Sequence, residues 1–224
     1  GQARHHHVAA DGEDRLDDFL PGEMLARFGK HRLGHANVAV LETLKSLPTA
    51  QLSGEDPLNK DLFRRMYQDS VDAYAWGLQF LPMNQRDGVQ TAADMAELIQ
   101  FATVKDYTNW IARLDGLGTY VDQTIALMRD GMRRGLVQPR VIMQRVPDQI
   151  ARQIVADPTA SPFYRPLREM PATIPAAEQE RLQAAARETI KRNVVPAFER
   201  LKTFVVEEYL PASRDTVGIW DTPG

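Results

Sequence analysis

Cysteine is absent from the 224 residues, and this absence removes several kinds of chemistry at once. Without a thiol the chain can form no disulfide, hold no iron–sulfur cluster, ligate no zinc through sulfur and use no cysteine nucleophile. Long apolar runs are also missing. The longest, such as residues 204–206, fall far short of the roughly 20 residues that cross a bilayer. No segment of the sequence is therefore expected to span a membrane.

An excess of positive charge is lacking too. Thirty acidic residues outweigh 27 basic ones, which leaves a formal net charge of −3. No run of Lys or Arg is long enough to neutralise a stretch of phosphates, so nucleic acid is not an expected partner. The composition, 43% hydrophobic and 25% charged, is instead typical of a compact domain or large lobe with a buried core.

The alternating pattern of a β-strand does not occur over five or more residues, whereas apolar residues recur at helical spacing along most of the chain. The predicted fold class is all-α: a multi-helix lobe with long, proline-kinked helices and no significant sheet. Helices are expected over residues 37–47, 53–77, 92–102, 104–114, 119–134, 139–154 and 175–210, with a loop over 157–166.

The helix after Ser53 is expected to be a core helix. Ser53 and Asp56 have the spacing of a capping box, and Pro57 suits the first turn. Apolar residues that begin with Leu58 and Leu62 then follow a period near 3.6. This pattern predicts one buried face of about six turns.

Other helix ends and breaks also have local signals. Thr103 is expected to cap a helix, and Gly135 to end one in the left-handed conformation. Residues 116–118, which include two glycines, predict a joint between two helices. Pro147 and Pro196 lie inside helical patterns, where each should bend or split its helix.

The N-terminal region, residues 1–36, is expected to be a polar tail with a weak helix, and residues 37–224 a single helical domain or lobe. Because the sequence starts at Gly1 rather than Met, we expect a processed, excised or engineered chain, which leaves its compartment open. Residues 5–7 are three histidines, either a metal-binding tract or a tag remnant. His31 and His35 have zinc-ligand spacing, but Arg32 stands where a metallopeptidase helix carries its glutamate. We therefore expect no metal site in this chain.

No complete catalytic constellation is recognisable, since a Ser-His-Asp set, a nucleophile elbow and a phosphate-binding loop are all missing. Candidate substrate-binding residues are Asn84, Gln85 and Arg86, because amides and a guanidinium on a turn suit a peptide backbone or carboxylate. Asn84 and Gln85 can equally bond nearby backbone. Tyr164 is a further candidate for lining a cleft, although Phe163 and Tyr164 can equally pin their loop to the core.

A series of motifs carries a family resemblance. These are Asp56-Pro57-Leu58-Asn59, Asp61-Leu62-Phe63-Arg64-Arg65, Leu81-Pro82-Met83-Asn84-Gln85, Tyr120 to Leu127, Gly135 to Val141, Ser161 to Tyr164 and Glu208 to Gly218. In this order they resemble the N-terminal half of the bacterial domain-of-unknown-function family 885, over about residues 50–224. Residues 1–36 match the family poorly.

The resemblance implies a helical lobe of a peptidase-like protein. Family members are similar to gluzincin-type metallopeptidases, in which a His-Glu-x-x-His helix in the second half carries zinc. This sequence ends before that helix, so no catalytic residue is carried over and the chain alone is expected to be inactive. The expected partners are the C-terminal catalytic half, which would supply zinc, and a peptide substrate in a cleft. A periplasmic or lipid-anchored form is suspected, with a cytoplasmic one still open.

A second hypothesis belongs to another class of protein. In this hypothesis the chain is a self-contained helical module for protein interaction or scaffolding, without enzymatic activity. A His-Glu-x-x-His motif further along the parent gene would favour the peptidase lobe over this module.

Overall fold

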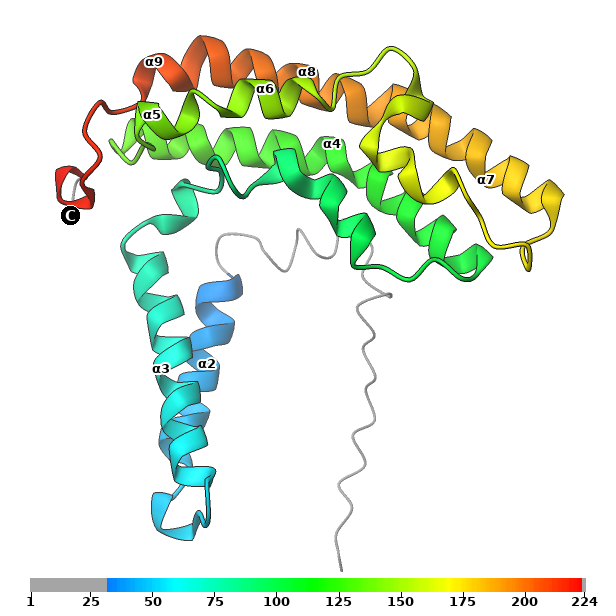
Figure 1. Ribbon diagram of the computed structural model, residues 1–224. Coiled ribbons are helices and arrows are strands. Elements are labelled where there is room, and N and C mark those ends of the chain that lie inside the picture. Colours follow the sequence, from blue (N-terminus) through cyan, green and yellow to red (C-terminus); the bar gives the residue numbers. More distant parts are fainter. Residues whose placement is uncertain (1–31, 223–224) are drawn as a thin grey trace, which may run out of the picture.

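The computed structural model describes residues 32–222, and within this range the chain is all-α, as the sequence predicts. The described residues contain no strand, and their only β-type pairing is an isolated bridge between Pro139 and Arg214. Figure 1 shows two parts: an elongated helical body and a helical hairpin that projects from one end of it.

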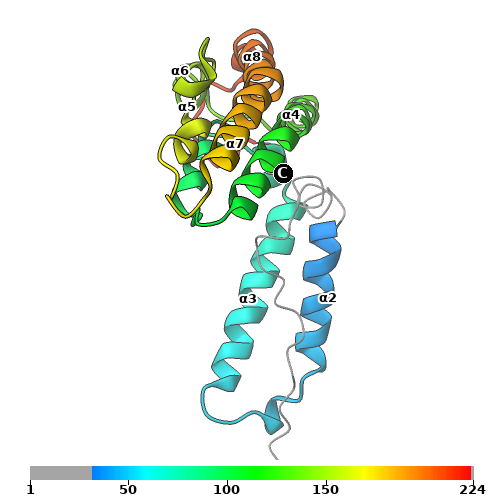
Figure 2. The same ribbon diagram turned by 90° about the vertical axis from the view of Figure 1, so that its right-hand side faces the viewer.

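The hairpin consists of α2 (Arg32–Ser46) and α3 (Asp56–Ala75), which lie side by side in both views (Figures 1 and 2). Lys60 holds the connection between them, because its Nζ atom donates to the carbonyl of Leu47 at 2.6 Å and to Oγ1 of Thr49 at 3.0 Å. The predicted capping box at Ser53 is wrong. Ser53 begins a turn, made possible by the positive φ of Gly54, and α3 begins three residues after Ser53, at Asp56.

The predicted buried face of α3 is also wrong, because no residue of α3 is buried. Leu58, Leu62 and Met66 are 62%, 56% and 56% exposed. The reason is that α2 covers one side of α3 while the body reaches only the end of the helix, through the short 3₁₀ helix η3 (Leu78–Phe80). The apolar period is real, but no described element covers it.

Two long helical segments that run parallel to each other form the body. One is α4 (Val104–Arg133); it continues through both glycines of residues 116–118, so the predicted joint there is wrong. The other segment comprises α7 (Ala176–Thr189), the π-helical turn η7 (Ile190–Val194), α8 (Val195–Phe204), the π-helical turn η8 (Val205–Tyr209) and α9 (Leu210–Ala212).

A ladder of three ionic contacts shows how the π-helical turns keep these segments in register. Asp115, Asp122 and Arg129 follow one another at intervals of seven residues on α4. Their partners, Arg192, Arg200 and Glu208, follow at intervals of eight. Each π-helical turn accommodates one extra residue, so the partners stay level. Pro196, where a bend is predicted, lies in the first turn of α8, which follows the first of these π-helical turns.

Shorter elements close the remaining side of the core. They are η4 (Val89–Glu97), α5 (Arg140–Met143), α6 (Val146–Ala151), η5 (Pro158–Ala160) and η6 (Pro162–Leu167); η9 (Ile219–Asp221) follows the body. The helix predicted over 92–102 is thus a 3₁₀ helix over 89–97, and the predicted loop contains two 3₁₀ helices. The split at Pro147 is confirmed, since this residue lies in the first turn of α6.

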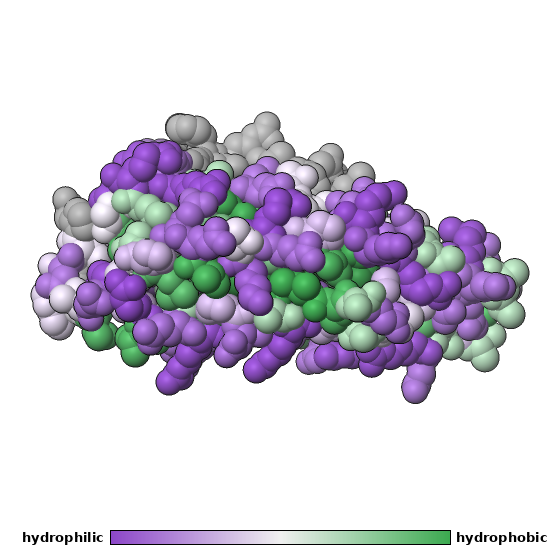
Figure 3. Space-filling view, turned by 90° about the horizontal axis from the view of Figure 1, so that it is seen from above, coloured by the Kyte–Doolittle hydropathy of each residue, from purple (hydrophilic) through white to green (hydrophobic). Residues whose placement is uncertain are grey.

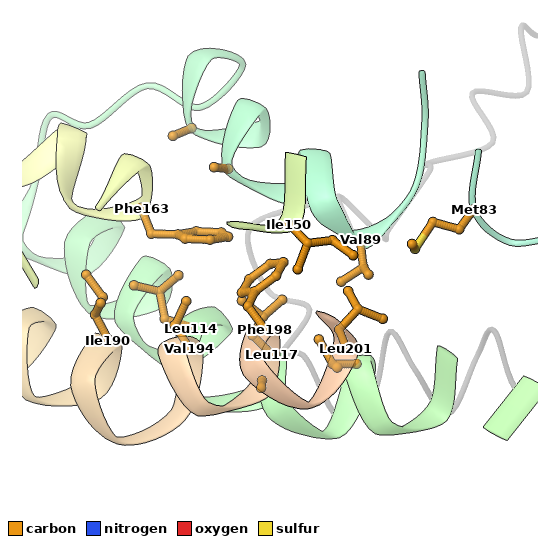
Figure 4. Close-up of a cluster of buried hydrophobic side chains, with 14 of the residues drawn as sticks. Met83, Val89, Leu114, Leu117, Ile150, Phe163, Ile190, Val194, Phe198 and Leu201 are labelled. Atoms are coloured by element: carbon orange, nitrogen blue, oxygen red, sulfur yellow. The ribbon is translucent and has the colours of Figure 1, made fainter. Parts of the chain in front are cut away.

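The core lies between the long segments and this cover. Figure 4 shows Phe198 near the middle of the cluster, with Leu114, Ile150 and Val194 around it. Trp110 ties the cover to α4, because its indole N–H donates to the carbonyl of Phe163 at 3.0 Å. Hydrophilic residues spread over most of the body seen from above, with hydrophobic residues in a band between them (Figure 3).

Candidate functional site

The candidate loop, residues 84–87, is a tight turn built by Asn84. The side-chain oxygen of Asn84 accepts hydrogen bonds from the backbone N–H groups of Arg86 at 2.8 Å and Asp87 at 3.1 Å. The backbone N–H of Asn84 donates to the carbonyl of Asp87 at 2.9 Å. For the side-chain oxygen of Asn84, the structure therefore shows the alternative in which this residue bonds nearby backbone. The short side chain of asparagine favours such local hydrogen bonds.

Three glutamines clamp the backbone that leads into this turn. The carbonyls of Met83, Asn84 and Gln85 are consecutive, and each accepts a hydrogen bond from a different side-chain amide. The donors come from three separate parts of the chain, the link before α5, η4 and α6: Gln138 at 3.2 Å, Gln90 at 2.7 Å and Gln149 at 2.8 Å. Each bond contributes about 1 kcal/mol. The turn is therefore held from behind, with its geometry set by the body rather than by the turn alone.

The clamp occupies backbone atoms and leaves side chains available. Arg86 is exposed, and its guanidinium makes no hydrogen bond or ion pair within residues 32–222. Gln85 contributes its carbonyl to the clamp, so its amide group is not consumed there. A fixed turn with a free guanidinium and a free amide can bind a carboxylate or a peptide bond.

Tyr120 of α4 interacts electrostatically with Asp87 of the turn. It is 39% exposed. Burial of part of the ring, together with the negative charge of Asp87, raises the pKa of its hydroxyl. Both effects favour the protonated form of the phenol, the form that can donate a hydrogen bond.

Tyr164 is not part of this arrangement. It is buried, and its hydroxyl accepts a hydrogen bond from Nη1 of Arg187 at 3.2 Å. Its neighbour Phe163 and the loop residue Met83 lie at opposite ends of the cluster in Figure 4. The structure therefore brings Asn84, Gln85 and Arg86 together and places Tyr164 elsewhere, where it anchors η6 to the core.

Several of the motifs that carry the family resemblance contact one another next to the turn at residues 84–87. Gln138 joins two of them, since its side chain reaches Met83 while its backbone N–H donates to the hydroxyl of Tyr209 at 3.0 Å. Arg140 reaches the end of α9, donating to the carbonyls of Leu210 at 2.7 Å and Ser213 at 3.1 Å. Burial raises the pKa of Tyr209. The motifs that carry the family resemblance thus build the support of the turn.

The sequence analysis did not single out Gln90, Gln149 or Tyr120 as functional. Gln138 and Tyr120 lie within motifs that carry the resemblance, which is a signal that could have drawn attention to them. Gln90 and Gln149 carry no local signal, because a glutamine that binds a distant carbonyl looks like any surface glutamine in a sequence. Only the fold reveals their partners.

No group of three or more His, Asp or Glu side chains within the described residues could hold a metal ion. His31 and residues 5–7 lie outside the described residues, and the side chain of His35 is not described. A depression lined by Ile99, Asp106, Asn109, Trp110 and Arg113 has room for about one water. Over residues 32–222, no helix is long and apolar enough to cross a membrane.

Comparison with models of known protein families shows to which family the chain belongs. Residues 6–224 match the model of a family described as bacterial protein of unknown function, DUF885. The chain belongs to this family. The match begins at residue 6, so the expectation that residues 1–36 match poorly and that the likeness starts near residue 50 was too narrow. No curated protein matches the chain.

Proposed function

We propose that this DUF885 chain is the substrate-side helical lobe of a zinc-dependent, peptidase-like protein. In this proposal the turn at residues 84–87 lines the substrate cleft, and the C-terminal catalytic half of the same protein supplies the zinc ligands and the general base. Zinc bound in that half would activate a water molecule for attack on a peptide bond. The residues described here would bind and orient the peptide.

The observation that carries the proposal is the glutamine clamp. Holding three consecutive carbonyls with side chains from three separate parts of the chain fixes the turn while leaving the guanidinium of Arg86 free. Such preorganisation is what a recognition loop needs, because a positioned group loses little freedom on binding. A turn that only connects two helices has no such need. The carboxylate of a peptide terminus or side chain is the ligand that best matches Arg86.

The test uses protein expressed from its complete coding sequence, with zinc measured by elemental analysis and activity by hydrolysis of a peptide library. We expect Arg86→Ala to raise KM about tenfold with little change in kcat, the result of losing a charged hydrogen bond present in both ground and transition states. The matched control is Lys202→Ala, an exposed cation of α8 without a hydrogen bond in the described structure. Unchanged KM in Arg86→Ala, or activity without zinc, would reject the proposal.

A second candidate function is the helical interaction module without enzymatic activity. The exposed apolar side of α3 favours it, because a single protein surface rarely leaves several large apolar side chains in a row uncovered. Absence of any peptide hydrolysis, together with a stable protein complex formed through α3, would favour this candidate over the peptidase lobe.

A further inference from the structure

One side of α3 carries an apolar stripe along the whole helix. Its members are spaced three or four residues apart, interrupted once by Asp69: Leu58, Leu62, Met66, Ala73 and Trp76. Residues at this spacing share a helix face. The large members are 56% to 72% exposed. In Figures 1 and 2, the only described segments beside α3 are α2 and the end of the body, so the stripe lies on the uncovered side.

Two opposite charges lie at the centre of this stripe. Arg65 and Asp69 are four residues apart on the same helix, yet neither makes a hydrogen bond or ion pair within residues 32–222. By contrast, Arg64 lies within 3.6 Å of the Asp61 carboxylate on another side of α3. The stripe therefore offers one positive and one negative group, both unpaired, on either side of its midpoint.

We propose that this stripe binds a second copy of the chain, with the two α3 helices antiparallel about a two-fold axis that crosses the stripe midway between Arg65 and Asp69. In that arrangement Arg65 lies opposite the partner's Asp69, and by symmetry the same pair forms again on the other side of the axis. Leu58 then lies opposite the partner's Trp76, and Leu62 beside the partner's Ala73. Large side chains meet small or flat ones, as helix packing requires.

The charges also select the antiparallel direction. Parallel pairing would place Arg65 against the partner's Arg65 and Asp69 against the partner's Asp69, and like charges in contact oppose association. A partner unrelated to this chain would not need to carry the same charges in reverse order. The self-complementary order on α3 therefore favours a second copy over another protein as the occupant.

The size of the stripe sets the expected strength. A helix of 20 residues is roughly 30 Å long, and contact along one such helix is at the small end of specific interfaces. We therefore expect a monomer–dimer equilibrium that depends on concentration, with a dissociation constant in the micromolar range. This inference does not depend on the proposed peptidase function.

Sedimentation equilibrium of the 224-residue chain tests the proposal directly. We expect the mass to rise from 25.2 kDa towards twice that value as concentration increases to roughly 200 µM. Arg65→Asp or Asp69→Arg alone should raise the dissociation constant at least about tenfold, whereas the double variant should restore dimerisation because it re-forms both pairs. Lys202→Asp on the body serves as control. Far-UV circular dichroism shows that each variant is folded.

Direction is tested by engineered cysteines, which the chain otherwise lacks. In the double variant Leu62→Cys/Ala73→Cys the two thiols lie roughly 16 Å apart on one helix, too far for a disulfide within the chain. Mild oxidation should give a covalent dimer of this variant and none of Leu62→Cys alone. A chain that stays monomeric throughout, or a dimer insensitive to both charge reversals, would overturn the proposal. A dimer cross-linked through Leu62→Cys alone would show parallel pairing and overturn it as well.

Discussion

The α2–α3 hairpin and the body use the same kind of helix in opposite ways. Both α3 and α4 carry apolar residues at helical spacing. In α4 that face is buried, with Leu114, Val121 and Met128 at most 2% exposed, whereas the corresponding residues of α3 are more than half exposed. The difference is the neighbour: α4 packs against α7, α8 and the short cover elements, while α3 packs against α2 and, at its end alone, against η3. Amphipathicity therefore indicates a face that needs a partner, and it does not identify which partner.

Stability should follow the same division. Burial of apolar surface supplies most of the free energy that stabilises a fold, so the body is expected to account for nearly all of it. In the hairpin, Leu41 is the one buried hydrophobic residue among the side chains that the structure describes between residues 37 and 76, so these residues add little by burial. Its structural value lies in the surface that it presents.

The largest expected effect comes from truncation in the body. Phe198 is fully buried, with its ring 5.9 Å from that of Phe163. Phe198→Ala should lower the free energy of unfolding by about 3–5 kcal/mol, through lost burial and the cavity left behind. Leu62→Ala on α3 should change it by less than about 0.5 kcal/mol. Urea denaturation at low protein concentration measures both. A large loss for Leu62→Ala would mean that its side is covered within the monomer.

A substitution at the junction between the hairpin and the body should have the next largest effect on stability. A methyl group on Gly131 of α4 would lie 2.7 Å from the carbonyl oxygen of Leu136 and 3.0 Å from Phe80, beside η3. Gly131→Ala should therefore destabilise the protein by about 1–3 kcal/mol.

Gly118 provides the matched control on the same helix. A methyl group there would approach its nearest neighbours at 3.8 Å, an ordinary contact. Gly118→Ala should stabilise by up to about 1 kcal/mol, because alanine is the better helix former. Thermal unfolding of the two variants compares them. Equal shifts in Tm would show that the junction is not tightly packed.

The sequence predicted what depends on local interactions. The helix cap at Thr103 and the left-handed Gly135, with a φ of 74°, are confirmed, because each is decided by neighbouring residues. The burial of α3 was predicted wrongly because burial depends on distant elements. The joint at residues 116–118 was also predicted wrongly because of distant elements. Packing of α4 against η7 and α8 outweighs the low helix propensity of glycine, so the helix continues.

The candidate site shows the same limit. The turn around Asn84 could be predicted, since Asn, Asp and Gly favour turns through local hydrogen bonds. Its support could not, because Gln149 lies 64 residues from the carbonyl it binds. Tyr164 was chosen as an aromatic residue in a loop. The sequence offered no means to tell whether its ring faces a cleft or the core, and the fold places it in the core.

The smallest expected effect lies at the start of α4 and depends on pH. Burial by itself would raise the pKa of Asp106, but hydrogen bonds from Thr103 and the backbone N–H of Ala102 outweigh it and hold that pKa below its ordinary value of 3.8. A carboxyl with a lowered pKa stabilises the fold above its ordinary pKa. This contribution is lost as pH falls through the lower folded pKa, because the protonated group no longer accepts these bonds as an anion. Asp106→Asn should therefore cost about 1 kcal/mol at pH 7, and the difference from the unmodified chain should shrink as pH falls below 3.8 and through the lower folded pKa. Urea titrations at several pH values measure this, with Asp94→Asn, an exposed carboxylate of η4, as control. A loss that persists undiminished at low pH would mean that the charge of Asp106 is not what stabilises this end of the body.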